Sequence, residues 1–345
     1  MIIDDFNFNL DNTTFIICEL SANHAHDINI ALKSIEIAKE IGANAVKIQT
    51  YTPDTMTIDC DKEDFVIKGT IWDGSNLYKL YQQAYTPWEW HKKLFKKAKE
   101  IGITLFSSPF DTSSVDFLEQ FDVPAYKIAS FEITDIPLIK YVASKGKPII
   151  ISTGIATLDD IILAIDTIKN EGNDQIILLK CTSSYPAPYD EVNLNMIKSF
   201  SDRFGVISGL SDHTLGSTVP LLSLAFGARV IEKHFIIDRS IGGPDSSFSM
   251  DKDEFSNMIK EIRKAEKCIG VENFLLTDSQ VKGRDFSRSL YVVDNVKKGQ
   301  IVSEKNIRSI RPGFGLHPKY LPQVIGKKFI FDVEKGTRFN LDLIE

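Results

Sequence analysis

Two histidines, His213 and His234, each follow a run of apolar residues near the middle of the chain. The first run ends in GLSDHT and the second in VIEKHF. If these runs are neighbouring parallel strands, their ends lie about 4.8 Å apart. Two imidazoles at that distance can share one divalent ion and leave positions open for water and a substrate, as catalytic metal sites do. The alternative is that each histidine packs in the core or caps a helix.

Two lysines and several serines stand in other strand-like runs. Lys47 lies in AVKIQ and Lys127 in AYKI. A lysine that points into a sheet or barrel is costly to bury unless it pairs with an anion. With hydroxyls from Ser130, Ser152 and Ser211, the two ammonium groups describe a pocket for a phosphate and a carboxylate. A barrel lysine can instead form a Schiff base, but the histidine pair weighs against that chemistry because it needs no metal.

These side chains need a fold that gathers strand ends. Short β-branched runs alternate with amphipathic helical stretches, and eight strands each followed by a helix predict an α/β fold, a (β/α)₈ TIM barrel with chemistry at the carboxyl ends of its strands. The predicted strands are 15–20, 45–49, 103–107, 125–128, 148–152, 176–180, 206–210 and 229–234. The predicted helices lie near 29–41, 88–101, 112–120, 135–145, 158–170, 192–202, 216–226 and 252–268.

One connection is too long for this pattern. Residues 50–86 join the second strand to the second helix without strong helical periodicity, and they carry Trp72, Tyr78, Tyr81 and Tyr85. A connection of this length in a compact domain is usually functional or disordered, and its aromatic residues argue against disorder. We expect a packed flap over the barrel mouth, a lining for a substrate, or both.

The chain changes character after the eighth predicted helix. We expect a barrel domain at 1–271, a polar exposed linker at 272–289 and a small, mostly β domain at 290–345. In this last domain two similar phrases, VKKGQIVS and VEKGTRFN, place a glycine turn between strand-like runs. So small a domain is near the lower size for independent folding, and it would gain stability by docking on another surface.

The composition of the chain limits the kinds of partner that it is expected to bind. The chain has 345 residues with 40 basic and 47 acidic side chains, and this net charge of −7 argues against a nucleic-acid surface. No apolar stretch is long enough to span a bilayer, and the acidic start MIIDDFNFNLDN has no signal-peptide core. The four cysteines have no metal or disulfide spacing, which is typical of reduced thiols. We therefore expect a cytoplasmic protein with no nucleic-acid or membrane partner.

The motifs that contain these residues resemble those of the sialic acid synthase family. In chain order they are ELSANH at 19–24, AVKIQ at 45–49, YKIAS at 126–130, ISTG at 151–154, GLSDHT at 209–214, EKHF at 232–235 and GPD at 243–245. The tail resembles that family's antifreeze-like (SAF) domain, including IRPGFG at 310–315. The opening ELSANHAHD, which lacks the glycine of N-acetylneuraminate synthases, and the aromatic insert are most similar to the pseudaminic acid branch.

The resemblance implies an enzyme that condenses phosphoenolpyruvate with an N-acetylated sugar aldehyde, forms a C–C bond, cleaves a C–O bond and releases phosphate. For the pseudaminic acid branch the acceptor is 2,4-diacetamido-2,4,6-trideoxy-L-altrose. The alternative within the family is an N-acetylneuraminate or legionaminic acid synthase, which uses another N-acetylated sugar. The alternative from another class is a non-catalytic carbohydrate-binding protein.

The resemblance also implies roles for particular residues. It implies phosphoenolpyruvate binding by Lys47, Ser108, Lys127, Ser130, Ser152, Ser183 and Ser211, sugar binding by Gln49, Glu132, Tyr185, Asp245 and Arg311, and a divalent metal, Mn²⁺ first and Co²⁺ or Mg²⁺ as alternatives, at His213 and His234. Glu19 and Glu132 are the candidates for proton transfer, although Glu19 could instead be a salt-bridge partner of Lys47. It further implies a domain-swapped homodimer in which Arg311 reaches the partner's sugar site.

The flap suggests a basis for acceptor choice. A 6-deoxy sugar presents a methyl group where other acceptors present a hydroxyl. An aromatic flap that carries Trp72 would bury that methyl and so stabilise the bound sugar by roughly 1 kcal/mol. A buried hydroxyl would lose more than that unless it found a hydrogen-bond partner.

Overall fold

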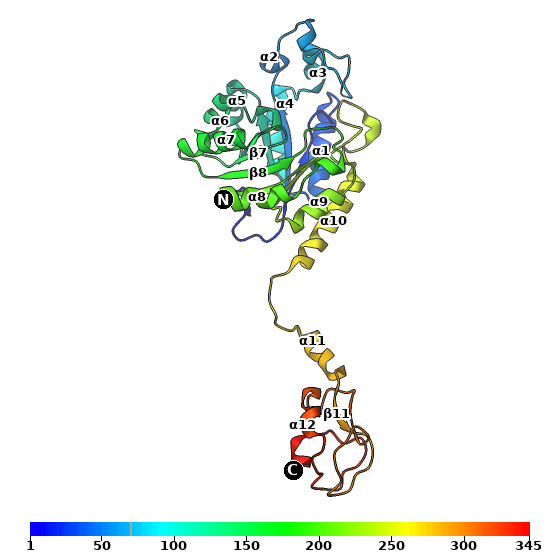
Figure 1. Ribbon diagram of the computed structural model, residues 1–345. Coiled ribbons are helices and arrows are strands. Elements are labelled where there is room, and N and C mark those ends of the chain that lie inside the picture. The colour runs from blue at the N-terminus through cyan, green and yellow to red at the C-terminus, as the bar shows by residue number, and fades with distance from the viewer. Residues whose placement is uncertain (70) are drawn as a thin grey trace. The chain divides into compact units, whose positions relative to one another are not determined.

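The computed structural model of the protein describes residues 1–69 and 71–345. The chain forms two compact units, Met1–Gly270 and Val271–Glu345 (Figure 1). Every predicted site residue except Arg311 belongs to the larger unit. Among the described residues, no helix is both long and apolar enough to cross a bilayer.

The larger unit is a closed barrel of eight parallel strands, which confirms the predicted TIM barrel. Around the ring the order is β10, β3, β4, β5, β6, β7, β8 and β9, so neighbours in sequence are neighbours in space. Each predicted strand agrees with an observed strand to within two residues at both ends. The strands are β3 (Phe15–Glu19), β4 (Ala45–Thr50), β5 (Thr104–Pro109), β6 (Tyr126–Ile128), β7 (Ile149–Ser152), β8 (Ile176–Cys181), β9 (Ile207–Asp212) and β10 (Val230–His234).

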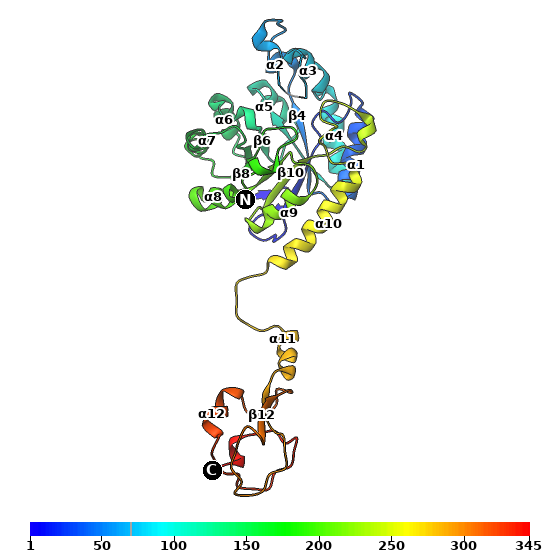
Figure 2. The same ribbon diagram turned by 45° about the vertical axis from the view of Figure 1, so that its right-hand side comes forward.

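Helices surround the ring of strands (Figure 2). They are α1 (Ile28–Glu40), α4 (Trp88–Ile101), α5 (Thr112–Glu119), α6 (Ile136–Ala143), α7 (Leu158–Asn170), α8 (Asn195–Phe204), α9 (Thr218–Ala225) and α10 (Lys252–Ile269). Asp27, Asp111 and Asp251 start α1, α5 and α10 because their carboxylates accept from free backbone N–H groups of the first turn. The helix predicted at 192–202 begins three residues later, after a 3-10 turn at Tyr189–Glu191.

The amino-terminal end of the barrel is closed by apolar residues. A short hairpin of β1 (Ile2–Ile3) and β2 (Phe6–Asn7) precedes the barrel. The Phe6 ring lies edge-on to Phe8 and Phe15, with centroids 4.8 and 5.0 Å away. Phe15 belongs to a buried cluster that includes Phe106, Ile150, Ile177, Leu179 and Val230 of the barrel strands. The barrel interior is therefore dry below the strand ends that carry polar groups.

The connection at 50–86 contains more regular structure than we expected. It includes α2 (Pro53–Met56), a 3-10 turn (Glu63–Phe65) and the two-turn helix α3 (Leu77–Ala84), while Thr70 lies outside the described residues. The expectation that it lacks strong helical periodicity is wrong for α3, where Leu77, Leu80, Tyr81 and Ala84 share one face. Asn76 starts this helix by accepting from the Tyr78 N–H. The segment is also packed onto the barrel, since His26 contacts the Gln82 carbonyl at 3.1 Å.

The smaller unit has its own apolar core. Its elements are α11 (Asp278–Gly283), a 3-10 turn (Arg284–Phe286), β11 (Ser289–Val292), β12 (Ile307–Ile310), a 3-10 turn (Pro318–Tyr320), α12 (Leu321–Val324) and a 3-10 turn (Leu341–Leu343). Strands β11 and β12 pair antiparallel. The core includes Leu290, Val302, Phe329 and Phe339. Within the expected linker at 272–289, the residues are exposed up to Arg288 but include α11.

Gly209 marks a close approach between the two strands that lead to the histidines. It lies in β9 opposite Val230 of β10. A Cβ atom at this position would stand 2.2 Å from the Val230 carbonyl oxygen and 2.9 Å from the Leu179 side chain. Only glycine fits here without moving the backbone.

We expect Gly209→Ala to lower the free energy of unfolding of the barrel by about 1–3 kcal/mol because the added methyl overpacks this contact. Urea denaturation followed by circular dichroism measures the change. Gly283→Ala in α11 is the control, since a Cβ there meets no atom within 4 Å. Equal stability of Gly209→Ala and wild type would show that β9 and β10 do not require this approach.

Candidate active site

The predicted site residues of the larger unit lie within the strands or just beyond their carboxyl ends. Since all eight strands run in the same direction, these positions share one rim of the barrel. Along the chain they are Glu19 at the end of β3, Lys47 and Gln49 in β4, Ser108 in β5, Lys127 in β6, Ser130 and Glu132 in the 3-10 turn (Ser130–Glu132) after β6, Ser152 at the end of β7, Ser183 and Tyr185 after β8, Ser211 in β9, His213 just after β9, His234 at the end of β10, and Asp245 in the loop after β10.

A buried cluster of charges occupies the middle of this rim. The Lys47 ammonium lies 2.9 Å from Glu19 Oε2 and 3.2 Å from Glu232 Oε1. The Lys127 ammonium lies 3.5 Å from the same Glu232 oxygen. All four side chains are buried. The ion pair between Glu19 and Lys47, which the sequence offered as an alternative role for Glu19, is present.

Glu232 was not among the predicted site residues, although it is the carboxylate that both lysines share. Ser211 of β9 also donates to it at 3.3 Å. The signal for Glu232 was present in the EKHF motif. Alternate residues of a strand point to the same face, so a strand that directs His234 into the barrel directs Glu232 there as well.

The two carboxylates beside Lys47, those of Glu19 and Glu232, have pKa values shifted in opposite directions. Burial raises the pKa of Glu232, but Lys127 and Lys47 outweigh it and the pKa is lowered. Burial raises the pKa of Glu19 to about 7, against the opposing effect of Lys47. Glu232 keeps the negative charge because it faces two ammonium groups. Glu19 can therefore take up or release a proton near neutral pH.

Hydroxyl groups surround the two ammonium groups. Lys127 donates to Ser152 Oγ at 2.7 Å, and Lys47 to Ser108 Oγ at 3.4 Å. Burial lowers the pKa of Lys127, an effect that Glu232 offsets only in part. Ammonium and hydroxyl donors that converge in a dry site suit an oxyanion such as a phosphate or a carboxylate.

A second group of hydroxyls lies beside the loop after β7. Ser183 donates to Ser130 Oγ at 2.8 Å, and the Ile155 N–H donates to the same Ser130 oxygen at 3.2 Å. A Cβ on Gly154 would stand 2.2 Å from Ser183 Oγ and 2.7 Å from Ser130 Oγ. The glycine of the ISTG motif thus leaves room for the two serines.

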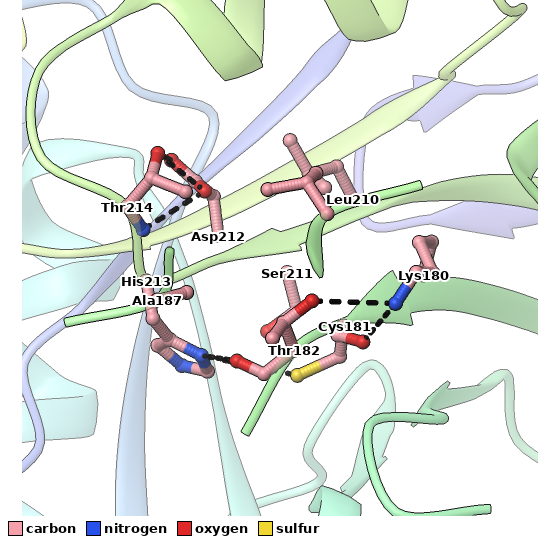
Figure 3. Close-up of a pocket in the computed structure, with 10 residues that line it drawn as sticks. Lys180, Cys181, Thr182, Ala187, Leu210, Ser211, Asp212, His213 and Thr214 are labelled. Carbon is pink, nitrogen blue, oxygen red and sulfur yellow. Dashed lines mark hydrogen bonds between the residues drawn. The ribbon is translucent and has the colours of Figure 1, made fainter. Parts of the chain in front are cut away.

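The two histidines face each other across the ends of β9 and β10, with ring centroids 5.3 Å apart. His213 Nδ1 lies 2.9 Å from the Thr182 carbonyl oxygen (Figure 3). A carbonyl only accepts, so Nδ1 carries a proton, and in the neutral imidazole Nε2 has the lone pair. His234 Nδ1 is buried and has no hydrogen-bond partner. Burial and the neighbouring His213 hold the pKa of His234 well below its ordinary value.

This donor set fits a divalent metal that takes two imidazole ligands. A histidine that binds metal usually donates its other N–H to a carbonyl or carboxylate, as His213 does. Within residues 1–69 and 71–345, no group of three His, Cys, Asp or Glu side chains is arranged to hold an ion. Any metal here would complete its coordination with water or substrate.

Aromatic side chains flank the histidines. The Tyr185 ring lies 4.4 Å from that of His213, and Phe248 lies 5.0 Å from His234. Trp72 of the 50–86 insert lies 5.7 Å from Tyr185 and donates from its indole N–H to the Pro244 carbonyl at 3.1 Å. We call Trp72, Tyr185 and Phe248 the aromatic wall. Phe248 was not predicted, because a lone phenylalanine in a loop gives no sign of its neighbours.

The remaining predicted residues occupy the edges of the site. Gln49 donates to Glu19 Oε1 at 3.1 Å, and Asp245 Oδ2 lies 3.9 Å from His234 Nδ1. Burial raises the pKa of Glu132 to about 7, and its Oε2 is buried without a hydrogen-bond partner. Arg311 lies in the smaller unit, where its side chain is exposed.

Two family models match the chain. The NeuB family matches residues 34–274, and the SAF domain matches residues 287–344. The chain therefore belongs to the NeuB family of sialic acid synthase-type enzymes and ends in a SAF domain. The resemblance drawn from the motifs is confirmed.

Characterised relatives refine this placement. The chain is 50% identical over 330 residues to the pseudaminic acid synthase of Campylobacter jejuni serotype O:23/36, with 96% of each chain covered. It is 44% identical over 331 residues to that of Helicobacter pylori, covering 96% of this chain and 97% of the relative. The N,N'-diacetyllegionaminic acid synthase of Legionella pneumophila is 37% identical over 338 residues, with 96% and 95% covered. The crystal structure of the N-acetylneuraminic acid synthetase of Leptospira borgpetersenii, 29% identical, superposes with a TM-score of 0.72 over 81% of this chain and 94% of that one.

The raised pKa of Glu132 predicts how the stability of the protein depends on pH. Because the pKa is raised from 4.5 to about 7, the folded protein binds more protons than the unfolded chain between these values, and stability falls as pH rises through this range. A shift of this size corresponds to about 3 kcal/mol. Over this pH range, we expect the free energy of unfolding to fall by up to that much less in Glu132→Gln than in wild type. Denaturation at several pH values measures the difference. Glu19 titrates in both proteins, so the difference isolates Glu132, and parallel pH profiles would contradict its assignment.

Proposed function

We propose that this protein is a pseudaminic acid synthase, a transferase that condenses phosphoenolpyruvate with 2,4-diacetamido-2,4,6-trideoxy-L-altrose and releases phosphate. The observation that carries this proposal is the 50% identity to the Campylobacter jejuni pseudaminic acid synthase over 96% of both chains. The second candidate is a legionaminic acid synthase, which has less support because that relative is only 37% identical. An N-acetylneuraminate synthase has weaker support still.

Phosphoenolpyruvate is the proposed ligand of the lysine cluster. When Glu19 is protonated and both lysines are charged, Lys47 and Lys127 face only the carboxylate of Glu232, and the cluster then carries net positive charge in a dry setting. Such a setting strengthens the attraction for an anion. The proposed hydroxyl contacts of its phosphate and carboxylate groups are Ser108, Ser130, Ser152, Ser183 and Ser211.

In the proposed reaction, carbon 3 of phosphoenolpyruvate forms a bond to the aldehyde carbon of the sugar, and the aldehyde oxygen gains a proton. Water adds to carbon 2, and the bond from carbon 2 to the phosphate oxygen breaks. Glu19 and Glu132 are the proposed proton-transfer groups, because a pKa of about 7 allows a carboxyl group to donate and accept at neutral pH. Gln49, Tyr185 and Asp245 are the proposed sugar contacts.

A divalent metal is part of this proposal, with His213 and His234 as its ligands. Mn²⁺ is the first choice, and Co²⁺ or Mg²⁺ are the alternatives. When bound, the ion would supply Lewis-acid polarisation of the sugar carbonyl. The fixed proton on His213 Nδ1 and the unpartnered, buried Nδ1 of His234 support it.

The proposal includes a homodimer in which the SAF domain of each subunit caps its partner's barrel and supplies Arg311. Exposed apolar side chains between the barrel and β11 support an association, since Val271, Phe274 and Leu275 are 83%, 97% and 84% exposed. Large apolar groups in water favour a covering surface. The cytoplasmic location stays a prediction.

A phosphate-release assay tests the function. Across a panel of acetamido sugars, we expect release to be fastest with the 6-deoxy diacetamido altrose, to stop with chelator and to return with Mn²⁺. His213→Ala should lose the metal-dependent turnover. Fastest release with N-acetylmannosamine would point to the neuraminate reaction. Chelator-resistant turnover with borohydride trapping of a lysine would replace the metal by a Schiff base.

The aromatic wall makes a separate prediction about acceptor choice. If Trp72 covers the methyl group of a 6-deoxy acceptor, Trp72→Ala should reduce the preference for 6-deoxy over 6-hydroxy sugars by about fivefold in kcat/KM, which corresponds to burial of one methyl. Trp72→Phe keeps a ring but loses the hydrogen bond to Pro244, and it should retain most of the preference. An unchanged preference in Trp72→Ala would remove the flap from acceptor selection.

A further inference from the structure

A second buried ion pair lies beside the histidines and has no part in the proposed reaction. The Lys233 ammonium lies 2.5 Å from Asp212 Oδ2, and the two side chains are 1% and 2% exposed. Asp212 directly precedes His213, and Lys233 directly precedes His234. Because consecutive residues of a strand point to opposite faces, this pair lies on the outer side of the barrel wall.

The pair also fixes the backbone on both sides of His213. Lys233 Nζ donates to the Thr214 carbonyl at 2.5 Å. The Asp212 carboxylate accepts from the Thr214 N–H at 3.1 Å and from the Thr214 hydroxyl at 2.9 Å (Figure 3). His213 therefore sits within a turn whose two flanking residues are both bonded to Lys233.

The position of the pair in the sheet explains why such bracing is needed. The register between β9 and β10 ends at the pair Lys233 and Asp212. His234 is still held by its pairing with Glu19 of β3, whereas His213 lies beyond the last residue of β9. The ion pair thus joins the strand ends at the point where their ladder stops.

We infer that the Asp212–Lys233 pair is a positioning device that sets the separation of the His213 and His234 imidazoles and hence their affinity for a shared divalent ion. The inference rests on the proposed metal site. Burying an ion pair carries a desolvation penalty that an apolar pair avoids. The pair lies directly beside both imidazoles, and a role in holding them in position explains why an ion pair is present here despite that penalty.

Binding of Mn²⁺ to protein freed of metal with chelator, followed by electron paramagnetic resonance, tests the inference without using turnover. The main variant is the double change Asp212→Leu with Lys233→Met, because it leaves no unpaired buried charge. We expect its Kd for Mn²⁺ to rise about ten- to hundredfold, as for other groups that orient metal ligands. Circular dichroism and phosphoenolpyruvate affinity should stay near those of wild type.

The control changes an ion pair at the other end of the barrel, Lys147 with Glu119, 3.0 Å apart. Lys147→Met with Glu119→Leu should leave the Kd for Mn²⁺ unchanged. If the main variant does not fold, Asp212→Asn retains the acceptor for Thr214 and should still raise the Kd. Lys233→Arg keeps the positive charge and should retain part of the wild-type affinity. A folded variant that binds Mn²⁺ as wild type does overturns the inference. If wild type binds none of Mn²⁺, Co²⁺ and Mg²⁺, the metal site itself is overturned, and the inference with it.

Discussion

The structure depends on one carboxylate, Glu232, placed between two ammonium groups in a dry barrel. Lys47 and Lys127 come from β4 and β6, and Glu232 comes from β10 across the ring. Neither lysine could stay charged there alone, because an isolated buried charge is strongly penalised. The closed ring of strands keeps these groups within contact distance, so the chemistry of the rim depends on the closure of the barrel.

Much of the barrel could be predicted from the sequence because its strands are buried on both faces. That burial produces the short β-branched runs, and the helices between them carry one apolar face. Helix α3 was not predicted even though Leu77, Leu80, Tyr81 and Ala84 recur at helical spacing, because an apolar pattern over only eight residues is ambiguous between helix and strand. The start of α8 was placed three residues too early because a 3-10 turn and an irregular bend at Asn193 precede it.

The site was predictable only where residue type and strand position agree. His213, His234, Lys47 and Lys127 are unusual at the ends of apolar runs, and the structure brings them to one rim. The sequence cannot state which oxygen faces which nitrogen. It therefore did not reveal that Glu232 is shared by two lysines, nor that Asp212 and Lys233 meet on the outer side of the wall.

The apolar residues Phe6, Phe8 and Phe15 pack at the amino-terminal end of the barrel, so substrates would enter at the opposite rim. The lysine cluster lies within the strands, while Tyr185, Asp245 and Trp72 lie in segments beyond the strand ends. If the two substrates bind as proposed, the smaller anion must enter before the sugar, which would otherwise obstruct the way in. The acid product carries the carbon atoms of phosphoenolpyruvate as well as those of the sugar, so it would occupy both layers of the site.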